Sequence, residues 1–365
     1  MIATASQLGE LLPHIESVER VALDTEADSL HSYREKLCLL QISVKGLDVI
    51  VDPLVRIDFS PLSDALEQKE IVLHGSDYDL RLLRRNLNFI PRQVFDTVIA
   101  ARLIGLREFG LVALVQRYFG IELTKTSQKA DWGERPLPRR MAEYAINDTK
   151  YLLPLAERLE IELNSRNRMD WFRQSCRRAL EQATIDRARD LDEAWRISGA
   201  GALSGQAAAV LRALWNWRET EAEAVDRPPF HILQNRELLG SAEKFVAGKV
   251  PDYRHFSERR RRKFQEAGQR ALELPEAEWP IKRRGSGKRP TAEIVRRIEQ
   301  LRAKRDRAAK SLELEPSFIA SRGTLEAVAA DETRADSLLV PWQQELLSIP
   351  VIKHQQAALS DQHRS

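Results

Sequence analysis

Three acidic residues alternate along an otherwise apolar segment near the start of the chain, VALDTEAD at residues 21–28. In an extended strand Asp24, Glu26 and Asp28 fall on one face, because successive side chains point to opposite sides. Like charges on one face repel each other, and Asp is disfavoured inside strands. Asp24 and Glu26 would lie about 6–7 Å apart, close enough to share a metal cation. The pattern therefore predicts either a cation site or a strand end that runs into solvent.

Two later segments add acidic and hydroxyl side chains. Asp79, in HGSDYDLRLL, is expected on the first turn of a helix that follows a short strand. Tyr144 and Asp148, in EYAINDTKYL, are four residues apart on a predicted helix and share a face. Four carboxylates can hold two divalent cations about 4 Å apart, which suits in-line displacement at phosphorus. Mg²⁺ or Mn²⁺ fits such an all-oxygen ligand set, and the tyrosine could orient the attacking water.

The elements around these residues are predicted as strands first and helices afterwards. Leu37–Val44 and Leu47–Val51 are expected to be strands joined by a tight turn at Lys45 and Gly46, and residues 70–75 a fourth short strand. Helical spacing begins at Asp77. The order predicts one α/β domain that opens with an antiparallel meander.

A long helix, interrupted near Pro154, is expected to close the α/β domain, which ends between residues 170 and 195. Beyond Ser198 the pattern is entirely helical. Residues 211–242 and 298–329 each combine a basic amphipathic helix, a proline-containing turn and a second helix, so two copies of one helical module are predicted.

Charge is distributed unevenly, with a net +3 for the chain and +11 for residues 253–310. A basic segment behind an acidic front half points to a polyanionic partner, although a solvated helix face gives the same composition. Cys38 and Cys176 are the only cysteines and form neither a disulfide framework nor a zinc site. No signal peptide or apolar membrane segment is recognised, so the cytoplasm is the expected location.

The ordered motifs resemble the DEDD 3′→5′ exonucleases of the tyrosine-bearing subgroup, and within them the ribonuclease D family. The three exonuclease motifs are VALDTEADSL, VLHGSDYDLRLL and YAINDTKYL. Between the second and third lie FDTVIAARLIG and LTKTSQKADWGERPLPRRMAEYA, which resemble the ribonuclease D lineage. The helical modules resemble helicase-and-RNase-D-C-terminal (HRDC) domains, most clearly in WNWRETEAEAVDRPPFHILQNRELL.

The resemblance implies an α/β ribonuclease-H-like exonuclease domain with a mixed sheet, followed by two small all-α HRDC-like domains. The implied limits are 1–195 with a connecting helix, 203–282 and 290–365. The implied activity is metal-dependent 3′→5′ exoribonuclease cleavage that releases 5′-mononucleotides. The implied substrates are tRNA precursors and other structured RNAs, digested from a single-stranded 3′ end. A monomer is favoured.

The resemblance also implies roles for individual residues. Asp24, Glu26 and Asp148 would bind the cation on the nucleophile side, and Asp24 with Asp79 the other cation. Tyr144 would position the attacking water. Counting from the strand that precedes the second motif selects Asp79 over its neighbour at position 77 as the metal-side carboxylate.

Two neighbouring acids are expected to have other roles. Asp77 is predicted to be a helix N-cap, and Asp28 a loop or substrate-proximal residue. Asp96 is expected to anchor a helix start.

Five further residues could contact substrate, and each has a structural alternative. His74 either contacts phosphate or sugar or is a satisfied strand-end histidine. Lys125, Lys129 and Arg135 could grip phosphates or lie on the surface. Trp132 could stack on a base or be buried against nearby apolar residues, the preferred interpretation.

Two other functions remain open on the residues alone. A 3′→5′ DNA exonuclease would use the same carboxylates, because they recognise phosphodiesters and not the sugar. A catalytically silent RNA-binding or scaffold protein is disfavoured, because all four carboxylates and the tyrosine are present.

Overall fold

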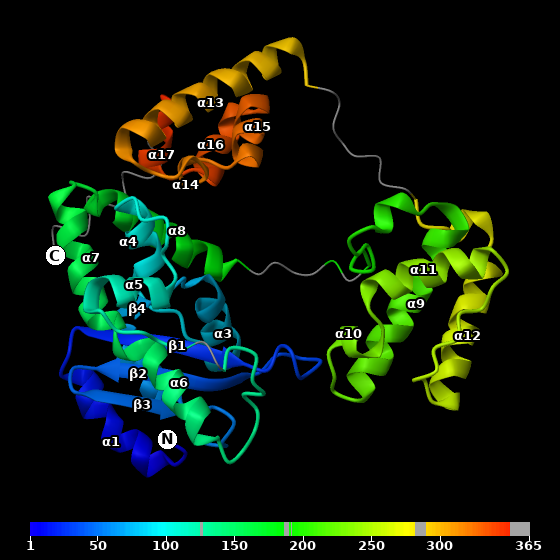
Figure 1. The fold of residues 1–365 in the computed structure, drawn as a ribbon, viewed down its shortest axis with the longest axis horizontal. Coiled ribbons are helices and arrows are strands. Elements are labelled where there is room, and N and C mark those ends of the chain that lie inside the picture. The colour runs from blue at the N-terminus through cyan, green and yellow to red at the C-terminus, as the bar shows by residue number, and fades with distance from the viewer. Residues whose placement is uncertain (125–126, 186–189, 191, 282–289, 351–365) are drawn as a thin grey trace. The chain divides into compact units, whose positions relative to one another are not determined.

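The computed structural model describes residues 1–365 except 125–126, 186–189, 191, 282–289 and 351–365 (Figure 1). The chain divides into two compact units. The first combines residues 1–26, 37–185 and 288–365, and the second combines residues 27–36 and 186–287.

A five-stranded mixed sheet forms the centre of the first unit, in the order β3-β2-β1-β4-β5. β2 and β3 are antiparallel, whereas β4 is parallel to both β1 and β5. The strands are β1 (Arg20–Ala27), β2 (Leu37–Val44), β3 (Leu47–Val51), β4 (Glu70–Leu73) and β5 (Gln93–Asp96). Val, Ile and Leu dominate β2 and β4, as expected for strands covered on both faces. The predicted mixed sheet and α/β fold class are confirmed.

Helices cover both faces of this sheet. On one face Val21 and Leu23 pack with apolar residues of α1 (Ala5–Glu16), α2 (Ser60–Glu67) and α3 (Asp77–Leu87). The other face is covered by α4, α6 and α7, and α6 packs on β2 and β3 (Figure 1). The remaining helices of this part are α4 (Thr97–Leu103), α5 (Leu111–Phe119), α6 (Arg139–Lys150), α7 (Leu152–Ser165) and α8 (Met169–Thr184).

The C-terminal helices pack onto this α/β core within the same unit. Trp342 stacks on Trp171 with ring centroids 5.0 Å apart, and its indole Nε1 donates to Ser175 Oγ at 3.1 Å. Arg168 donates to the carbonyl of Leu312 at 2.8 Å. These helices are α13 (Ala292–Leu312), α14 (Pro316–Ile319), α15 (Arg322–Ala330), η3 (Glu332–Arg334), α16 (Ala335–Leu338) and α17 (Pro341–Leu347).

In its described residues between 192 and 281, the second unit consists of helices joined by loops. Its core gathers around Trp217, Phe245, Phe256 and Phe264. The elements are η1 (Ala200–Ala202), α9 (Gly205–Ala224), α10 (Pro229–Ile232), α11 (Asn235–Val246), α12 (Glu258–Leu272) and η2 (Glu276–Glu278). The predicted internal repeat has a structural counterpart, because a long helix, a four-residue helix led by proline and a third helix occur both in α9–α11 and in α13–α15.

Three local predictions need adjustment. The sequence did not predict β5, which pairs in parallel with β4. Ser76, and not Asp77, occupies the N-cap position of α3, so the predicted cap at Asp77 is wrong. The helix interruption falls at Tyr151, between α6 and α7, and Pro154 lies in the first turn of α7.

None of the helices among the described residues is long and apolar enough to cross a membrane.

Candidate active site

Strand β1 and helix α6 bring three carboxylates together. Val21 and Leu23 are buried on one face of β1, so Asp24 and Glu26 point to the opposite face, which α6 covers. One carboxylate oxygen of each of Asp24, Glu26 and Asp148 lies within 4.8 Å of the others. The alternation in β1 and a single helix position therefore create a compact acidic cluster.

Asp79 extends this cluster from the first turn of α3. It is buried and accepts a hydrogen bond from the Thr25 hydroxyl, and its charge acts on Asp24. Its neighbour Asp77 instead points outward, with 61% of its side chain exposed, and pairs with Arg81. Of the two aspartates, the structure places Asp79 beside Asp24.

Asp96 fixes the turn that carries Asp79. It is the N-cap of α4 and accepts from the backbone N–H groups of Val98 at 2.8 Å and Ile99 at 3.2 Å. The same carboxylate accepts from the backbone N–H groups of Gly75 at 3.2 Å and Ser76 at 2.8 Å, immediately before α3. One capping residue thus ties the start of α3 to the start of α4.

Burial and mutual repulsion raise the pKa values of the clustered carboxyls. Desolvation raises the pKa of Glu26 to about 9 and that of Asp148 to about 7. Burial also raises the pKa of Asp79 to about 6, and that of Asp24 well above its usual range, where repulsion from Asp79 and Asp148 adds to the effect. No Lys or Arg among the described residues forms an ion pair with Asp24, Glu26 or Asp148. Divalent cations, which prefer oxygen ligands, fit this donor set.

These shifts predict a pH-dependent stability for the metal-free protein. Between the unfolded pKa values near 4 and the raised folded values, the folded state binds more protons than the unfolded state. The free energy of unfolding therefore falls as pH rises from about 5 to about 9. We expect the melting temperature in EDTA to decrease over this range and Mg²⁺ to restore it at pH 8. A decrease in EDTA that Mg²⁺ leaves unchanged would contradict the expectation.

Tyr144 lies one helical turn before Asp148 on α6. Its hydroxyl lies close enough to the Asp148 carboxylate for the two groups to shift each other's pKa. Burial, followed by the charges of Asp148 and Glu26, raises the pKa of Tyr144, so its hydroxyl stays protonated at neutral pH. The Trp132 ring packs beside it with centroids 5.9 Å apart. Tyr144 is thus a neutral donor held at the edge of the acidic cluster.

Trp132 and Arg135 have structural roles in the segment before α6. Trp132 is only 1% exposed and packs with Leu39 and Met141, so no base can stack on its ring. The Arg135 guanidinium makes five hydrogen bonds within the protein. Its Nε and one terminal nitrogen each donate to the Asp52 carboxylate at 2.7 Å. Its two terminal nitrogens also donate to the backbone carbonyls of Cys38, Trp132 and Glu134 at 2.8–2.9 Å. All five of its N–H groups are used, so the expected phosphate contact at Arg135 is corrected to an internal anchor.

His74 is a half-buried histidine at the end of β4. Its Nδ1 lies 2.8 Å from Thr97 Oγ1, and that hydroxyl donates its one proton to the Leu73 carbonyl. His74 Nδ1 must therefore be the donor, which leaves Nε2 as an acceptor. Burial lowers the pKa of His74, so the neutral ring does not act as a cationic phosphate ligand. Of the two expected lysines, Lys129 is exposed and Lys125 lies outside the described residues.

The basic run at the start of α12, residues 259–263, is largely paired with acids inside the second unit. Arg260 and Lys263 both contact Glu221, at 3.4 and 3.0 Å. Arg261 pairs with Asp252 at 3.0 Å, and Arg262 lies 3.8 Å from Glu266. The formal charge of this segment therefore overstates the positive charge that it offers to a polyanion.

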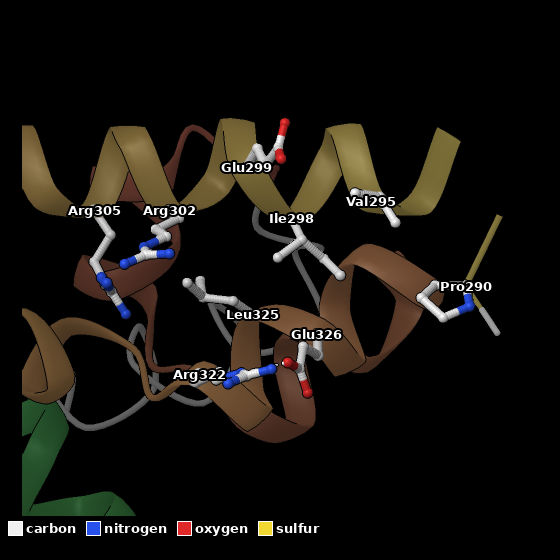
Figure 2. Close-up of a pocket in the computed structure, with 9 residues that line it drawn as sticks. All are labelled: Pro290, Val295, Ile298, Glu299, Arg302, Arg305, Arg322, Leu325 and Glu326. Atoms are coloured by element: carbon white, nitrogen blue, oxygen red, sulfur yellow. Dashed lines mark hydrogen bonds and ion pairs between the residues drawn. The ribbon is translucent and has the colours of Figure 1, made fainter. Parts of the chain in front are cut away.

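A surface pocket of about 490 Å³ lies elsewhere, between α13 and α15 of the C-terminal helices. Figure 2 shows Arg302 and Arg305 on α13 directed toward it, and the Arg322–Glu326 pair on α15. None of the residues of the acidic cluster lines this pocket.

Thr25 is a functional neighbour that the sequence did not single out. Thr25 alternates with Asp24 and Glu26 in β1 and so points to the opposite, mainly apolar face, where its hydroxyl donates to Asp79. Its position in the sequence, between Asp24 and Glu26, is the feature that could have identified it. The threonine links the carboxylate of α3 to the strand that carries the other two.

Comparison with known proteins agrees with this geometry. A family model described as 3'-5' exonuclease matches residues 1–164, and a model of the HRDC domain matches residues 207–246. Ribonuclease D of Sphingobium indicum is 31% identical over 247 residues, and ribonuclease D of Zymomonas mobilis is 32% identical over 247 residues. Over these residues the chain is a homologue of ribonuclease D. In both pairs the match covers 66% of this chain and 63% of the relative.

The fold has a counterpart among solved ribonuclease D structures. Escherichia coli RNase D, described as an exoribonuclease involved in structured RNA processing, superimposes with a TM-score of 0.71. The superposition covers 100% of this chain and 98% of that chain at 23% identity. This likeness shows that the ribonuclease D homologue shares the whole fold, with an exonuclease domain, an HRDC domain and a helical C-terminal part.

Proposed function

We propose that this ribonuclease D homologue is a metal-dependent exoribonuclease that removes nucleotides from RNA 3′ ends and releases 5′-mononucleotides. The observation that carries the proposal is the half-buried cluster of Asp24, Glu26 and Asp148, with Asp79 beside Asp24. Such a cluster is stable in ionised form only with cations, and paired cations promote displacement at phosphorus.

Two divalent cations, Mg²⁺ or Mn²⁺, would be held by these four carboxylates. Asp24, Glu26 and Asp148 would hold the first, and Asp24 and Asp79 the second. When bound, they would lower the pKa of the attacking water and neutralise the departing 3′ oxygen.

Tyr144 supplies a neutral hydrogen-bond donor that can position the attacking water, which ionised carboxylates cannot do. Its neutral hydroxyl can donate to a water or to a phosphate oxygen near Asp148, and that carboxylate can accept in return. The Thr25–Asp79 hydrogen bond and the Asp96 cap hold the second carboxylate in place during the reaction.

The proposed substrate is RNA with a single-stranded 3′ end, including tRNA precursors. A single strand must reach carboxylates that are half-buried between β1 and α6, so stable stems should stop digestion. We assign the exonuclease domain to residues 1–195 and two HRDC-like domains to 203–282 and 290–365, and we place the protein in the cytoplasm as a monomer. The HRDC-like domains would hold RNA through contacts that weaken with salt.

A direct assay tests the function. A 5′-labelled single-stranded RNA and the matching DNA would each be incubated with protein in Mg²⁺, Mn²⁺ or EDTA. We expect a metal-dependent ladder that shortens from the 3′ end on RNA. Faster digestion of the DNA would favour a DNA exonuclease, and retention of RNA in a gel shift without digestion would indicate a silent binding protein.

We expect Tyr144→Phe to lower the turnover rate on RNA by about 100-fold, because general acid–base or water-positioning groups contribute about that much or more. The KM for RNA should change little, since the hydroxyl lies next to the acidic cluster. Steady-state rates on the labelled RNA measure both constants. Tyr151→Phe, a tyrosine at the junction of α6 and α7, is the matched control and should keep its rate. Equal rates for the Tyr144 variant and the wild type would exclude this role.

A further inference from the structure

Gln41, in the middle of β2, is fully buried and unpartnered. Its side chain is 0% exposed, and neither its Nε2 nor its Oε1 hydrogen-bonds any described part of the chain. Buried side-chain amides normally find partners, since an unmade hydrogen bond to a buried polar group is destabilising. The remaining seven residues of β2 are aliphatic side chains, one cysteine and one serine. The packing of the strand therefore does not explain why a glutamine stands at this position.

The register of the sheet places Gln41 under helix α6. It lies directly opposite Ile50 in the β2–β3 ladder, so both side chains share a face, and Ile50 packs in one cluster with Ala145 of α6. Leu39, two residues earlier on the same face, belongs to that cluster. Ser43, two residues later, hydrogen-bonds Thr149 of α6 at 2.8 Å. Gln41 is thus flanked by contacts to Ala145 and Thr149.

The segment of α6 between these two contacts carries Asp148. β2 also neighbours β1 in the sheet, and Asp24 and Glu26 of β1 point to the same face, because their carboxylates meet Asp148 there. The buried amide of Gln41 therefore lies on the face of the sheet that carries the acidic cluster. It is on the strand next to β1 and beneath α6, the two elements that supply the clustered carboxylates.

We infer that Gln41 is a positioning residue for this cluster, in which its amide hydrogen-bonds the Asp148 carboxylate, directly after rotation of the side chain or through one water. The inference rests on the proposed function. Carboxylates that bind metal ions are commonly oriented by such outer hydrogen bonds, whose loss weakens metal binding. The Nε2 group donates to the ionised carboxylate, and Oε1 remains free to accept from a bridging water.

The test replaces the amide with an unbranched apolar side chain, Gln41→Met. The metal-free melting temperature, the affinity for Mn²⁺ by calorimetry at fixed pH, and kcat and KM on single-stranded RNA would be measured. We expect a melting temperature in EDTA equal to or above that of the wild type, because an unpartnered amide is removed. We expect Mn²⁺ binding to weaken about tenfold and kcat to fall with KM nearly unchanged. Leu39→Met, on the same strand and face, is the matched control and should keep wild-type Mn²⁺ affinity.

Several results would overturn the inference. Unchanged Mn²⁺ affinity in Gln41→Met would remove the link to the cluster, and an equal loss in Leu39→Met would indicate a general packing effect. A sharp fall in the metal-free melting temperature, or failure to fold, would make the amide a structural element. Wild-type protein that binds Mn²⁺ but leaves RNA intact would defeat the proposed function alone, since the Mn²⁺ affinities would still decide the role of Gln41. Wild-type protein that binds no Mn²⁺ would defeat both.

Discussion

Replacing Asp148 with asparagine is expected to lower the rate of RNA shortening by about a thousandfold or more while making the metal-free protein more stable. The rate falls because the α6 carboxylate is one of three oxygen ligands within 4.8 Å of each other, and a neutral amide binds a divalent cation weakly. The stability rises because the substitution removes one of the clustered, half-buried like charges that raise the pKa values of Asp24 and Glu26.

The two effects of Asp148→Asn have opposite signs, which makes the prediction specific. At pH 8 in EDTA we expect a gain of about 1–2 kcal/mol in the free energy of unfolding, and at pH 5 a smaller gain, since the clustered carboxyls are then protonated in the folded state. Urea unfolding at both pH values and single-turnover RNA assays measure the two effects.

The matched control for Asp148→Asn is Asp77→Asn, an exposed carboxylate near the same site that pairs with Arg81. Its activity should stay within about twofold of the wild type, and its stability within about 0.5 kcal/mol. Loss of both activity and stability in Asp148→Asn would mean that the carboxylate supports the fold and not a cation.

The acidic site was largely predictable because its main determinants are local. The alternation of Asp24 and Glu26 depends only on strand geometry, and the four-residue spacing of Tyr144 and Asp148 only on helix geometry. The bounds of β2 and β3 also follow from local signals, since Gly46 between them adopts a φ of 83° that favours glycine in a tight turn.

Features that depend on distant partners were not predictable. The four residues of β5 include only Val94 and Phe95 as apolar residues, and their extended form depends on pairing with β4. Trp342 packs on Trp171, which is 171 residues away in the sequence, and no local sequence pattern indicates this contact. The substrate-facing interpretation of Arg135 failed for the same reason, because its partner Asp52 is 83 residues away.

Breaking the long-range pair of Arg135 and Asp52 is expected to have the second large effect. We expect Arg135→Ala to cost about 3 kcal/mol of unfolding free energy, because it leaves the carboxylate of Asp52, with 4% of its side chain exposed, buried and unpaired. The carbonyls of Cys38 and Trp132 also lose a donor, so the segment that packs Trp132 against Tyr144 loosens. RNA turnover should fall together with stability, and urea unfolding together with RNA assays measures both.

A double-mutant cycle with Asp52→Asn separates the pair from its surroundings. The double variant should be more stable than Arg135→Ala alone, because the unpaired charge is removed. Arg139→Ala, which breaks the exposed pair with Glu143, is the matched control and should cost less than about 0.5 kcal/mol. Equal costs at positions 135 and 139 would show that the Arg135–Asp52 pair contributes no more than a surface contact. A cost confined to position 135, with turnover lost in parallel, would identify this arginine as the link between the edge of the sheet and the helix that carries Tyr144 and Asp148.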